Sequence, residues 1–234
     1  MNRQDAAPVV AALRDYVRYL QRLGVTELPL PPSLGAPRSA APVPAVTRLQ
    51  QLEESVRHCD RCRLHQGRTQ VVFGTGNPEA DLVFVGEAPG RDEDLQGEPF
   101  VGAAGQLLTR IIEAIGLRRE QVYLLNVVKC RPPNNRNPRS DEVAACRPIL
   151  QAQLDCLRPR VICALGTFAA QTLLQTEERI SRLRGRFHKL GEINVMPTYH
   201  PAYLLRNPQE KRAVWQDMQA VRRLLEGHTA NASL

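Results

Sequence analysis

Short apolar runs alternate with amphipathic segments along the central and C-terminal parts of this chain. We predict buried strands at residues 82–86, 122–127, 161–166 and 193–198, where apolar residues gather in short runs. We predict helices at residues 102–115, 140–157, 167–176 and 211–225, where apolar positions follow helical spacing. The alternation predicts an α/β fold, with three α/β/α layers around a central, mainly four-stranded parallel sheet. Ligands of such sheets bind at the carboxyl ends of the strands.

The N-terminal part has a different pattern. Apolar residues at helical spacing over residues 7–23, followed by Gly24, predict an amphipathic helix. Residues 28–46 are rich in Pro, Ala and Ser, which is typical of a linker. We therefore divide the chain into an N-terminal helical segment (1–27), a Pro-rich linker (28–46), a compact domain (47–226) and a polar tail (227–234).

Composition and charge narrow the class of protein. With 234 residues the chain is too short for two full domains. It has no apolar run near the ~20 residues that span a bilayer and no secretory signal, so we expect a soluble, cytoplasmic protein without membrane contacts. The formal charge of +7 and the pI near 9.4 are compatible with a polyanionic partner, although charge balance alone is a weak signal.

Basic residues also gather in two places. One group is Arg179, Arg182, Arg184, Arg186 and Lys189, and the other is Lys129, Arg131, Arg136, Arg139 and Arg147. A solvated basic face explains either group alone. Because both groups flank the same candidate site, they favour phosphate contacts.

Four of the six cysteines form a spaced set. Cys59 and Cys62 make a C-x2-C pair, and Cys130 and Cys146 follow far downstream, beyond a glycine-rich turn at residues 86–90. A C-x-x-C pair alone fits zinc, a redox dithiol or an iron–sulfur cluster, and the distant second pair favours a cluster that joins two loops. We predict that the other two, Cys156 and Cys163, are buried in the core.

Four motifs accompany these cysteines: GEAPGRDED at 86–94, GEPFVG at 97–102, LLNVVKC at 124–130 and HPAYLL at 200–205. In this order, with these cysteines, they resemble the iron–sulfur uracil-DNA glycosylases, family 4 of that superfamily. The resemblance covers about residues 52–225 and leaves residues 1–46 outside it. It implies a catalytic domain at 47–226 and a [4Fe–4S] cluster bound by Cys59, Cys62, Cys130 and Cys146, with zinc as the alternative. Hydrolysis moves no net electrons, so we expect a structural cluster.

The resemblance also implies a pocket for a flipped uracil. Phe100 is expected to stack on the base and Asn126 to read its edge, because a carboxamide can donate to O4 and accept from N3–H. His200 is expected to donate to O2, where negative charge develops as the base leaves. Gly86 and Ala88 are expected to bind the substrate within the same turn.

The two glutamates are harder to assign. Glu87 stands where the wider superfamily often has Asp or Asn, and our hypothesis is that it orients the attacking water and stabilises the cationic sugar. Glu93 is the candidate that crowds the C5 edge against the methyl group of thymine. For contacts with DNA we predict Arg131, Asn135, Arg136, Arg184 and Arg186.

The expected function is excision of uracil from single- or double-stranded DNA by a monomer, which leaves an abasic site for base excision repair. We expect no lyase step, because Lys129 adjoins Cys130 and is interpreted as structural or phosphate-facing. Three alternatives remain. One is a relative that traps the sugar on a histidine, which is disfavoured because no His lies between Cys130 and Cys146. The others are a glycosylase with broader deaminated-base specificity and a non-catalytic iron–sulfur DNA-binding module.

The N-terminal helix could dock a repair or replication partner, or merely cover the domain.

Overall fold

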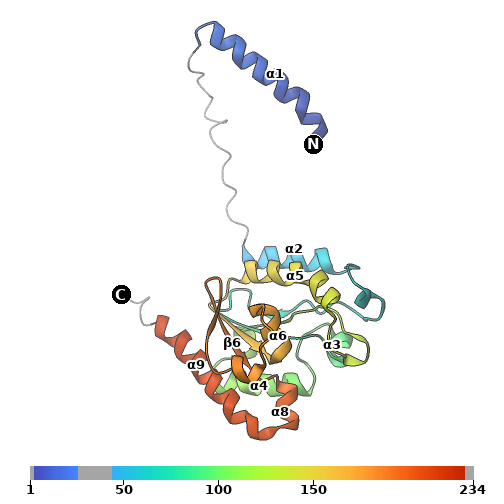
Figure 1. The fold of residues 1–234 in the computed structure, drawn as a ribbon, viewed down its shortest axis with the longest axis vertical. Helices are drawn as coiled ribbons and strands as arrows, with labels where there is room; N and C mark the ends of the chain where they lie inside the picture. Colours follow the sequence, from blue (N-terminus) through green and yellow to red (C-terminus); the bar gives the residue numbers. More distant parts are fainter. Residues whose placement is uncertain (1–2, 26–43, 230–234) are drawn as a thin grey trace. The chain divides into compact units, whose positions relative to one another are not determined.

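The computed structural model describes residues 3–25 and 44–229. The chain forms two compact units, Met1–Pro42 and Val43–Leu234. The first contains helix α1 (Arg3–Arg22), where the sequence predicts a helix, and its partner role stays a prediction (Figure 1). Most of the predicted linker and the last residues of the tail, 230–234, lie outside the described residues.

The second unit is built on a sheet with the strand order β1-β3-β2-β4-β6-β5. The strands are β1 (Thr75–Gly76), β2 (Leu82–Gly86), β3 (Tyr123–Asn126), β4 (Val161–Leu165), β5 (His188–Leu190) and β6 (Ile193–Thr198). The four central strands β3, β2, β4 and β6 are parallel, which confirms the predicted sheet. The outer strands β1 and β5 pair antiparallel and were not predicted, because neither contains an apolar run long enough to identify a strand.

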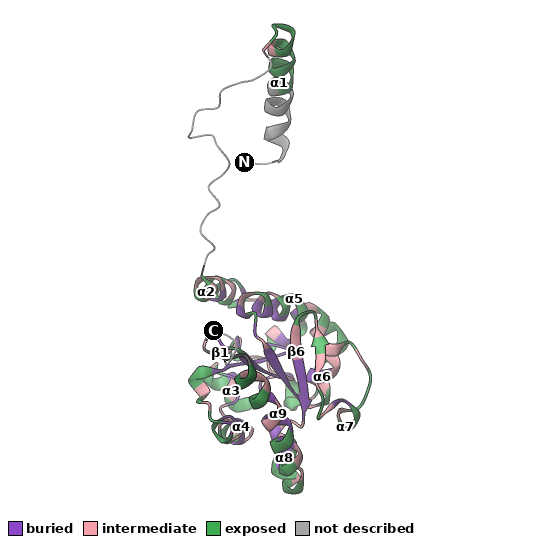
Figure 2. Ribbon diagram, turned by 90° about the vertical axis from the view of Figure 1, so that its left-hand side faces the viewer, coloured by how far each residue is buried: buried purple, intermediate pink, exposed green. Residues whose placement is uncertain are grey.

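Helices cover both faces of this sheet (Figures 1 and 2). On one face lie α2 (Ala45–Val56), α5 (Ser140–Leu157) and α6 (Gly166–Leu174); on the other lie α4 (Ala103–Ala114), α8 (Pro201–Arg206) and α9 (Lys211–Thr229). Successive residues of β2 alternate between the two cores, with Val83 and Val85 in the first and Leu82 and Phe84 in the second. This arrangement is the predicted three-layer α/β/α fold.

The remaining short elements are α3 (Arg91–Gln96), α7 (Ile180–Leu183) and 3-10 turns at Arg63–Gln66, Arg119–Gln121, Pro133–Asn135 and Pro208–Glu210. The predicted helices are present, and α9 continues beyond its predicted end at Leu225. The sequence pattern did not reveal α2, α3 or α7, whereas Pro201 after His200 indicated the start of α8. Helices α3 and α7 have six and four residues, too few to display a helical period.

Strand ends position the candidate site. Gly86 at the end of β2 pairs with Asn126 at the end of β3, and β6 ends at Thr198, just before His200. Because the strands are parallel, these carboxyl ends meet at one edge of the sheet.

Two other sequence expectations concern the cysteines and the membrane. Cys163 in β4 is fully buried, as predicted, whereas Cys156 is only partly buried at the edge of the core. In the residues the structure describes, no helix has the length and apolarity to cross a membrane.

A buried polar network fastens α9 to the sheet. Asp217 is 1% exposed and accepts a hydrogen bond of 2.6 Å from Oγ1 of Thr198 on β6. Arg184 donates to both of its carboxylate oxygens, at 2.7 Å from Nη2 and 3.2 Å from Nε. The guanidinium also donates to the carbonyl of Ala213. Thr198 of β6 and Arg184, from the segment before β5, therefore both bind the carboxylate of Asp217.

Replacing Asp217 with Ala should lower the free energy of unfolding by about 3–5 kcal/mol, because the partly buried guanidinium of Arg184 and the buried hydroxyl of Thr198 lose their partner. Chemical denaturation at neutral pH measures this loss. The control is Glu54→Ala, which breaks the exposed Arg57–Glu54 ion pair on α2 and should cost less than about 1 kcal/mol. Equal losses in the two variants would contradict the role given to Asp217.

Candidate functional site

A pocket opens at the carboxyl ends of β2 and β3 and brings together most of the residues predicted for substrate binding and catalysis. Its lining includes Glu87, Ala88, Glu93, Phe100, Asn126 and His200. These residues come from the turn after β2, helix α3, the loop before α4, the end of β3 and the start of α8. Their meeting at one edge follows from the parallel sheet.

Gly86 contributes to this pocket by having no side chain. A Cβ at this position would lie 2.4 Å from Oδ1 of Asn126 and 2.5 Å from Cζ of Phe100. Gly86 is not itself among the lining residues of the pocket. Any larger residue here would displace Phe100 and Asn126, so Gly86 sets how closely the two can approach.

Asn126 is 2% exposed, yet its side chain reaches the pocket. Within the described residues, its carboxamide has no hydrogen-bond partner. The amide atoms are not among the fully buried atoms without a partner in the described residues, so they are accessible from the pocket. The amide is therefore available to a polar ligand edge.

His200 caps the N-terminus of α8, and this contact fixes its tautomer. Nδ1 accepts a hydrogen bond of 3.1 Å from the backbone N–H of Ala202, so the ring proton of the neutral imidazole is on Nε2. Burial lowers the pKa of His200 to about 4, with a smaller opposing effect from the Glu93 carboxylate. At neutral pH His200 is thus an uncharged donor through Nε2.

Phe100 supplies the flat apolar surface of the pocket. It is 6% exposed, and its ring lies 6.1 Å from that of His200, centroid to centroid, at an interplanar angle of 34°. Its backbone has φ of 58°, in the left-handed region that residues other than glycine rarely adopt.

Glu87 is partly buried on the turn after β2. Burial raises the pKa of its carboxyl above the usual value. It also lines an adjoining hollow that contains Arg179, Ser181 and Tyr203. Glu87 therefore lies between the pocket and a neighbouring surface groove.

Glu93 has contacts that the sequence did not suggest. Oε1 accepts hydrogen bonds of 3.0 Å from the backbone N–H groups of Val101 and Gly102, and Oε2 accepts one of 3.1 Å from Gly90. Its predicted role against the C5 edge stays a prediction. The contacts favour a different one, in which the carboxylate holds the loop that contains Phe100.

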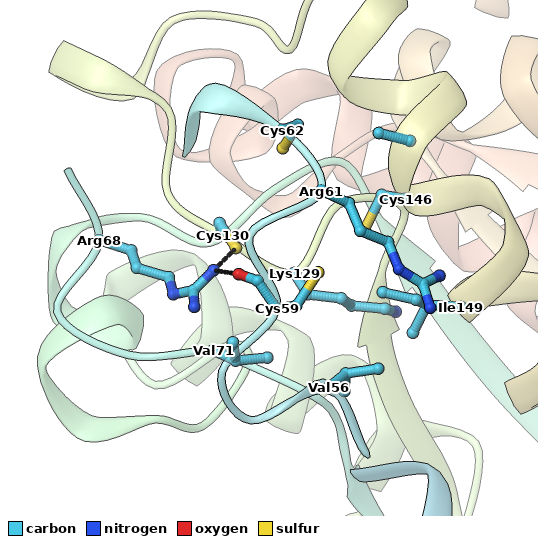
Figure 3. Close-up of a pocket in the computed structure, with 11 residues that line it drawn as sticks. Val56, Cys59, Arg61, Cys62, Arg68, Val71, Lys129, Cys130, Cys146 and Ile149 are labelled. Atoms are coloured by element: carbon cyan, nitrogen blue, oxygen red, sulfur yellow. Dashed lines mark hydrogen bonds between the residues drawn. The ribbon is translucent and has the colours of Figure 1, made fainter. Parts of the chain in front are cut away.

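The four spaced cysteines line a second pocket, between the segment after α2, the loop after β3 and α5 (Figure 3). Cys59, Cys62, Cys130 and Cys146 share it with the apolar side chains Val56, Val71 and Ile149. All four are free thiols. In the described part of the chain, no group of His, Cys, Asp and Glu side chains is close enough together to hold a single metal ion as it stands.

The donor set of this pocket nevertheless suits a thiolate-bound group. Burial raises the pKa of Cys130 to about 11 and also raises that of Cys146. A bound metal must therefore displace protons from these thiols, as is usual for cysteine ligands. Arg68, which sequence reasoning missed, donates from Nη1 to Sγ of Cys130 at 3.1 Å and to the carbonyl of Cys59 at 2.7 Å. A single arginine thus connects the first and third cysteines of the set.

Lys129 is 1% exposed and faces the cysteine pocket. Its ammonium donates to the backbone carbonyl of Asn126 at 2.5 Å. Burial lowers the pKa of Lys129 to about 8, although the nearby Cys146 and Cys130 act in the opposite direction. Of the two expected roles the structural one fits, because a buried ammonium cannot face a phosphate.

The five residues predicted to contact DNA differ in how far contacts within the protein already occupy their side chains. Arg131 donates to Oδ1 of Asn135 at 2.7 Å on the exposed loop beside the pocket. Arg186 is exposed, with one distant ion pair at 3.9 Å to Glu178. Arg136 instead makes a two-pronged contact with Glu142, which is fully buried. Arg184 is held by Asp217 and lies over the ring of Tyr199, so its guanidinium is largely used within the fold.

Sequence reasoning also missed Asn137, Tyr203 and Arg206, which line the pocket with the predicted residues. Tyr203 belongs to the HPAYLL motif, so the motif already indicated that part of the wall. Asn137 is on the loop between the third and fourth cysteines, where the sequence gives no sign of which side chains turn inward.

Comparison with known proteins agrees with these motifs. A family model described as the uracil DNA glycosylase superfamily matches residues 73–219. A type-4 uracil-DNA glycosylase of Archaeoglobus fulgidus is 47% identical over 184 residues, which make up 74% of this chain and 92% of the relative.

Two further relatives give similar values. A type-4 uracil-DNA glycosylase of Sulfurisphaera tokodaii is 45% identical over 75% of this chain and 84% of its own. Another, of Thermotoga maritima, is 45% identical over 76% of this chain and 95% of its own. The similarity therefore extends over nearly the whole length of the relatives.

Proposed function

The chain belongs to the uracil-DNA glycosylase superfamily and to its type-4 group, and from this premise we propose that it excises uracil from DNA by hydrolysis of the N-glycosidic bond. One observation carries the proposal. The unpartnered amide of Asn126 faces a pocket that also contains the ring of Phe100 and the imidazole of His200.

Base recognition follows from the shape and polarity of this pocket. A flipped uracil stacks on Phe100 and presents its Watson–Crick edge to Asn126. The amide donates to O4 and accepts from N3–H, whereas cytosine has a donor and a bare ring nitrogen at the same places. The amide also gains the partner that it lacks in the protein alone, which favours the correct base.

Hydrolysis breaks the bond between N1 of uracil and C1′ of the sugar. The electron pair leaves with the base and spreads to O2, where Nε2–H of His200 donates a hydrogen bond. A neutral imidazole is suited to this task because it can donate a hydrogen bond to O2 while it keeps its own proton. Glu87, on the turn after β2, stabilises the cationic sugar and orients a water whose oxygen bonds to C1′. The proton that this water loses passes through solvent, and the uracil anion takes up one proton in return.

We infer that Cys59, Cys62, Cys130 and Cys146 would hold a [4Fe–4S] cluster, and the four thiols that line one pocket support this inference. Such a group would supply a rigid covalent junction and no redox step, because hydrolysis needs none. Arg68 and Lys129 place two positive charges beside the thiolates, which favours their deprotonated form. With Cys130 and Cys146 bound to such a group, the loop between them would be held in place, and its residues Arg131 and Asn135 could meet DNA phosphates.

The reaction stops at the abasic site. A lyase step needs an amine that can reach C1′, and Lys129 is buried and bonded to a backbone carbonyl. The enzyme works as a monomer on single- and double-stranded DNA in the cytoplasm. Its affinity falls as salt rises, because basic side chains release counterions from the phosphates.

Replacing Asn126 with Ala should lower kcat/KM for a uracil-containing oligonucleotide by about 10²-fold or more, because two hydrogen bonds to the base edge are lost. Alkaline cleavage of a labelled strand measures excision. Asn77→Ala is the control, since Asn77 makes a turn contact with Glu79 away from the pocket. Full activity in Asn126→Ala would contradict the pocket, and no excision by a folded wild-type protein would contradict the function.

The metal group is tested by protein purified without oxygen. A cluster predicts a brown protein with about four iron atoms per chain, and Cys146→Ala should lose both the iron and the colour. Cys156→Ser, outside the cysteine pocket, should keep them. A colourless protein with one zinc ion would overturn the cluster in favour of the zinc alternative.

The pH dependence separates Glu87 from His200. Since burial raises the pKa of Glu87, its carboxylate is lost on acidification before His200 gains a proton at its pKa of about 4. Single-turnover rates should therefore fall with pH through the raised pKa of Glu87, and Glu87→Gln should be slower but lack that fall. A decline near pH 6.5 that vanishes in His200→Asn would mean that His200 titrates like an ordinary histidine.

A further inference from the structure

The loop that contains Phe100 is held in an unfavourable conformation. Phe100 has φ of 58°, and a bulky side chain in the left-handed region persists only where its surroundings enforce it. The ring could turn away from the pocket if the backbone relaxed. Some contact on either side of Phe100 must therefore keep the peptide units in place.

The contact on the C-terminal side comes from Glu93. Its Oε1 accepts from the N–H groups of Val101 and Gly102, the two residues that follow Phe100. These bonds fix the peptide after the strained residue. They do not hold the peptide that joins Pro99 to Phe100.

The contact on the N-terminal side comes from Arg119. Its Nη2 donates to the carbonyl of Pro99, the residue before Phe100, at 2.6 Å. Nη1 lies 3.4 Å from Oγ1 of Thr109 on α4, and that hydroxyl donates to the carbonyl of Gly105 at 3.2 Å. Arg119 therefore connects the loop to a helix of the core.

Helix α4 also packs against the backbone of Phe100. A Cβ on Gly105 would lie 1.8 Å from the backbone oxygen of Phe100, so α4 packs directly against the strained peptide. Arg119 itself is outside the base pocket, because it is not among the residues that line it. Any effect of Arg119 on the base must pass through the loop.

We propose that Arg119 is a positioning residue for base stacking: by holding the carbonyl of Pro99 opposite the Glu93 contacts, it keeps Phe100 in the left-handed conformation that turns its ring to the uracil. The inference rests on the proposed function, since it takes Phe100 as the stacking surface. No motif in the sequence points to Arg119, which lies in a polar turn before β3.

The test is Arg119→Met, with Arg118→Met as its control. Arg118 is the exposed neighbour in the same turn, so the control removes one positive charge without touching the loop. We expect Arg119→Met to weaken inhibition by free uracil and to lower kcat/KM on uracil-containing DNA, each by about 10-fold, the size of one lost hydrogen bond from a charged donor. Arg118→Met should leave both constants within about twofold.

Two further variants separate positioning from stability. Arg119→Lys keeps one donor towards Pro99 and should recover part of the loss. Thr109→Val removes the anchor on α4 and should weaken uracil inhibition to a smaller extent. Amide hydrogen exchange at Val101 and Gly102 should quicken in Arg119→Met, because the loop loses its opposite support. If Arg119→Met fails to fold, the inference is tested in Arg119→Lys and Thr109→Val through the inhibition constant of uracil and kcat/KM.

Phe100→Ala distinguishes failure of this inference from failure of the proposed function. If Phe100→Ala weakens uracil inhibition while Arg119→Met does not, the pocket stands and Arg119 has no positioning role. A lower melting temperature in Arg119→Met, with unchanged uracil inhibition and exchange, also overturns the inference in favour of a purely structural role. If Phe100→Ala itself leaves excision and uracil inhibition unchanged, the stacking pocket is wrong and the inference falls with it.

Discussion

Gly86 pairs with Asn126 at the ends of two parallel strands, and the N–H groups of Val127 and Val128 extend the pairing to the carbonyls of Gly86 and Glu87. This pairing sets the distances within the whole site. It puts the amide of Asn126 beside the turn that carries Glu87, and the missing side chain of Gly86 lets this amide and the Phe100 ring come together. A shift of register by one residue would turn Asn126 to the opposite face of the sheet.

The fold was predictable because the sheet is buried on both faces. Strands such as β2 and β4 must then be apolar throughout, and such runs are visible in a sequence. The edge strands β1 and β5 have no such requirement, since each pairs on one side only. The candidate site residues were predicted through motifs, and the parallel topology explains why motifs far apart in the chain line the same pocket.

What the sequence could not predict is how the charged side chains are used. Glu93, Arg136 and Arg184 all looked available to substrate, yet each is held by partners of the protein itself. A carboxylate or guanidinium has the same sequence signature whether it meets a ligand or a backbone group. Arg68 and Arg119 show the converse, because they have structural contacts next to functional residues but belong to no recognisable motif.

The two pockets are connected through one short stretch of chain. Asn126 lines the base pocket, Cys130 lines the cysteine pocket, and the ammonium of Lys129 donates to the carbonyl of Asn126. A group bound to Cys130 would therefore also restrict Asn126, four peptide units away. Under the proposed function, such a group would take no part in bond breaking and would act on base recognition through the rigidity of this segment. The contacts of Glu93 and Arg119 have the same proposed effect on Phe100.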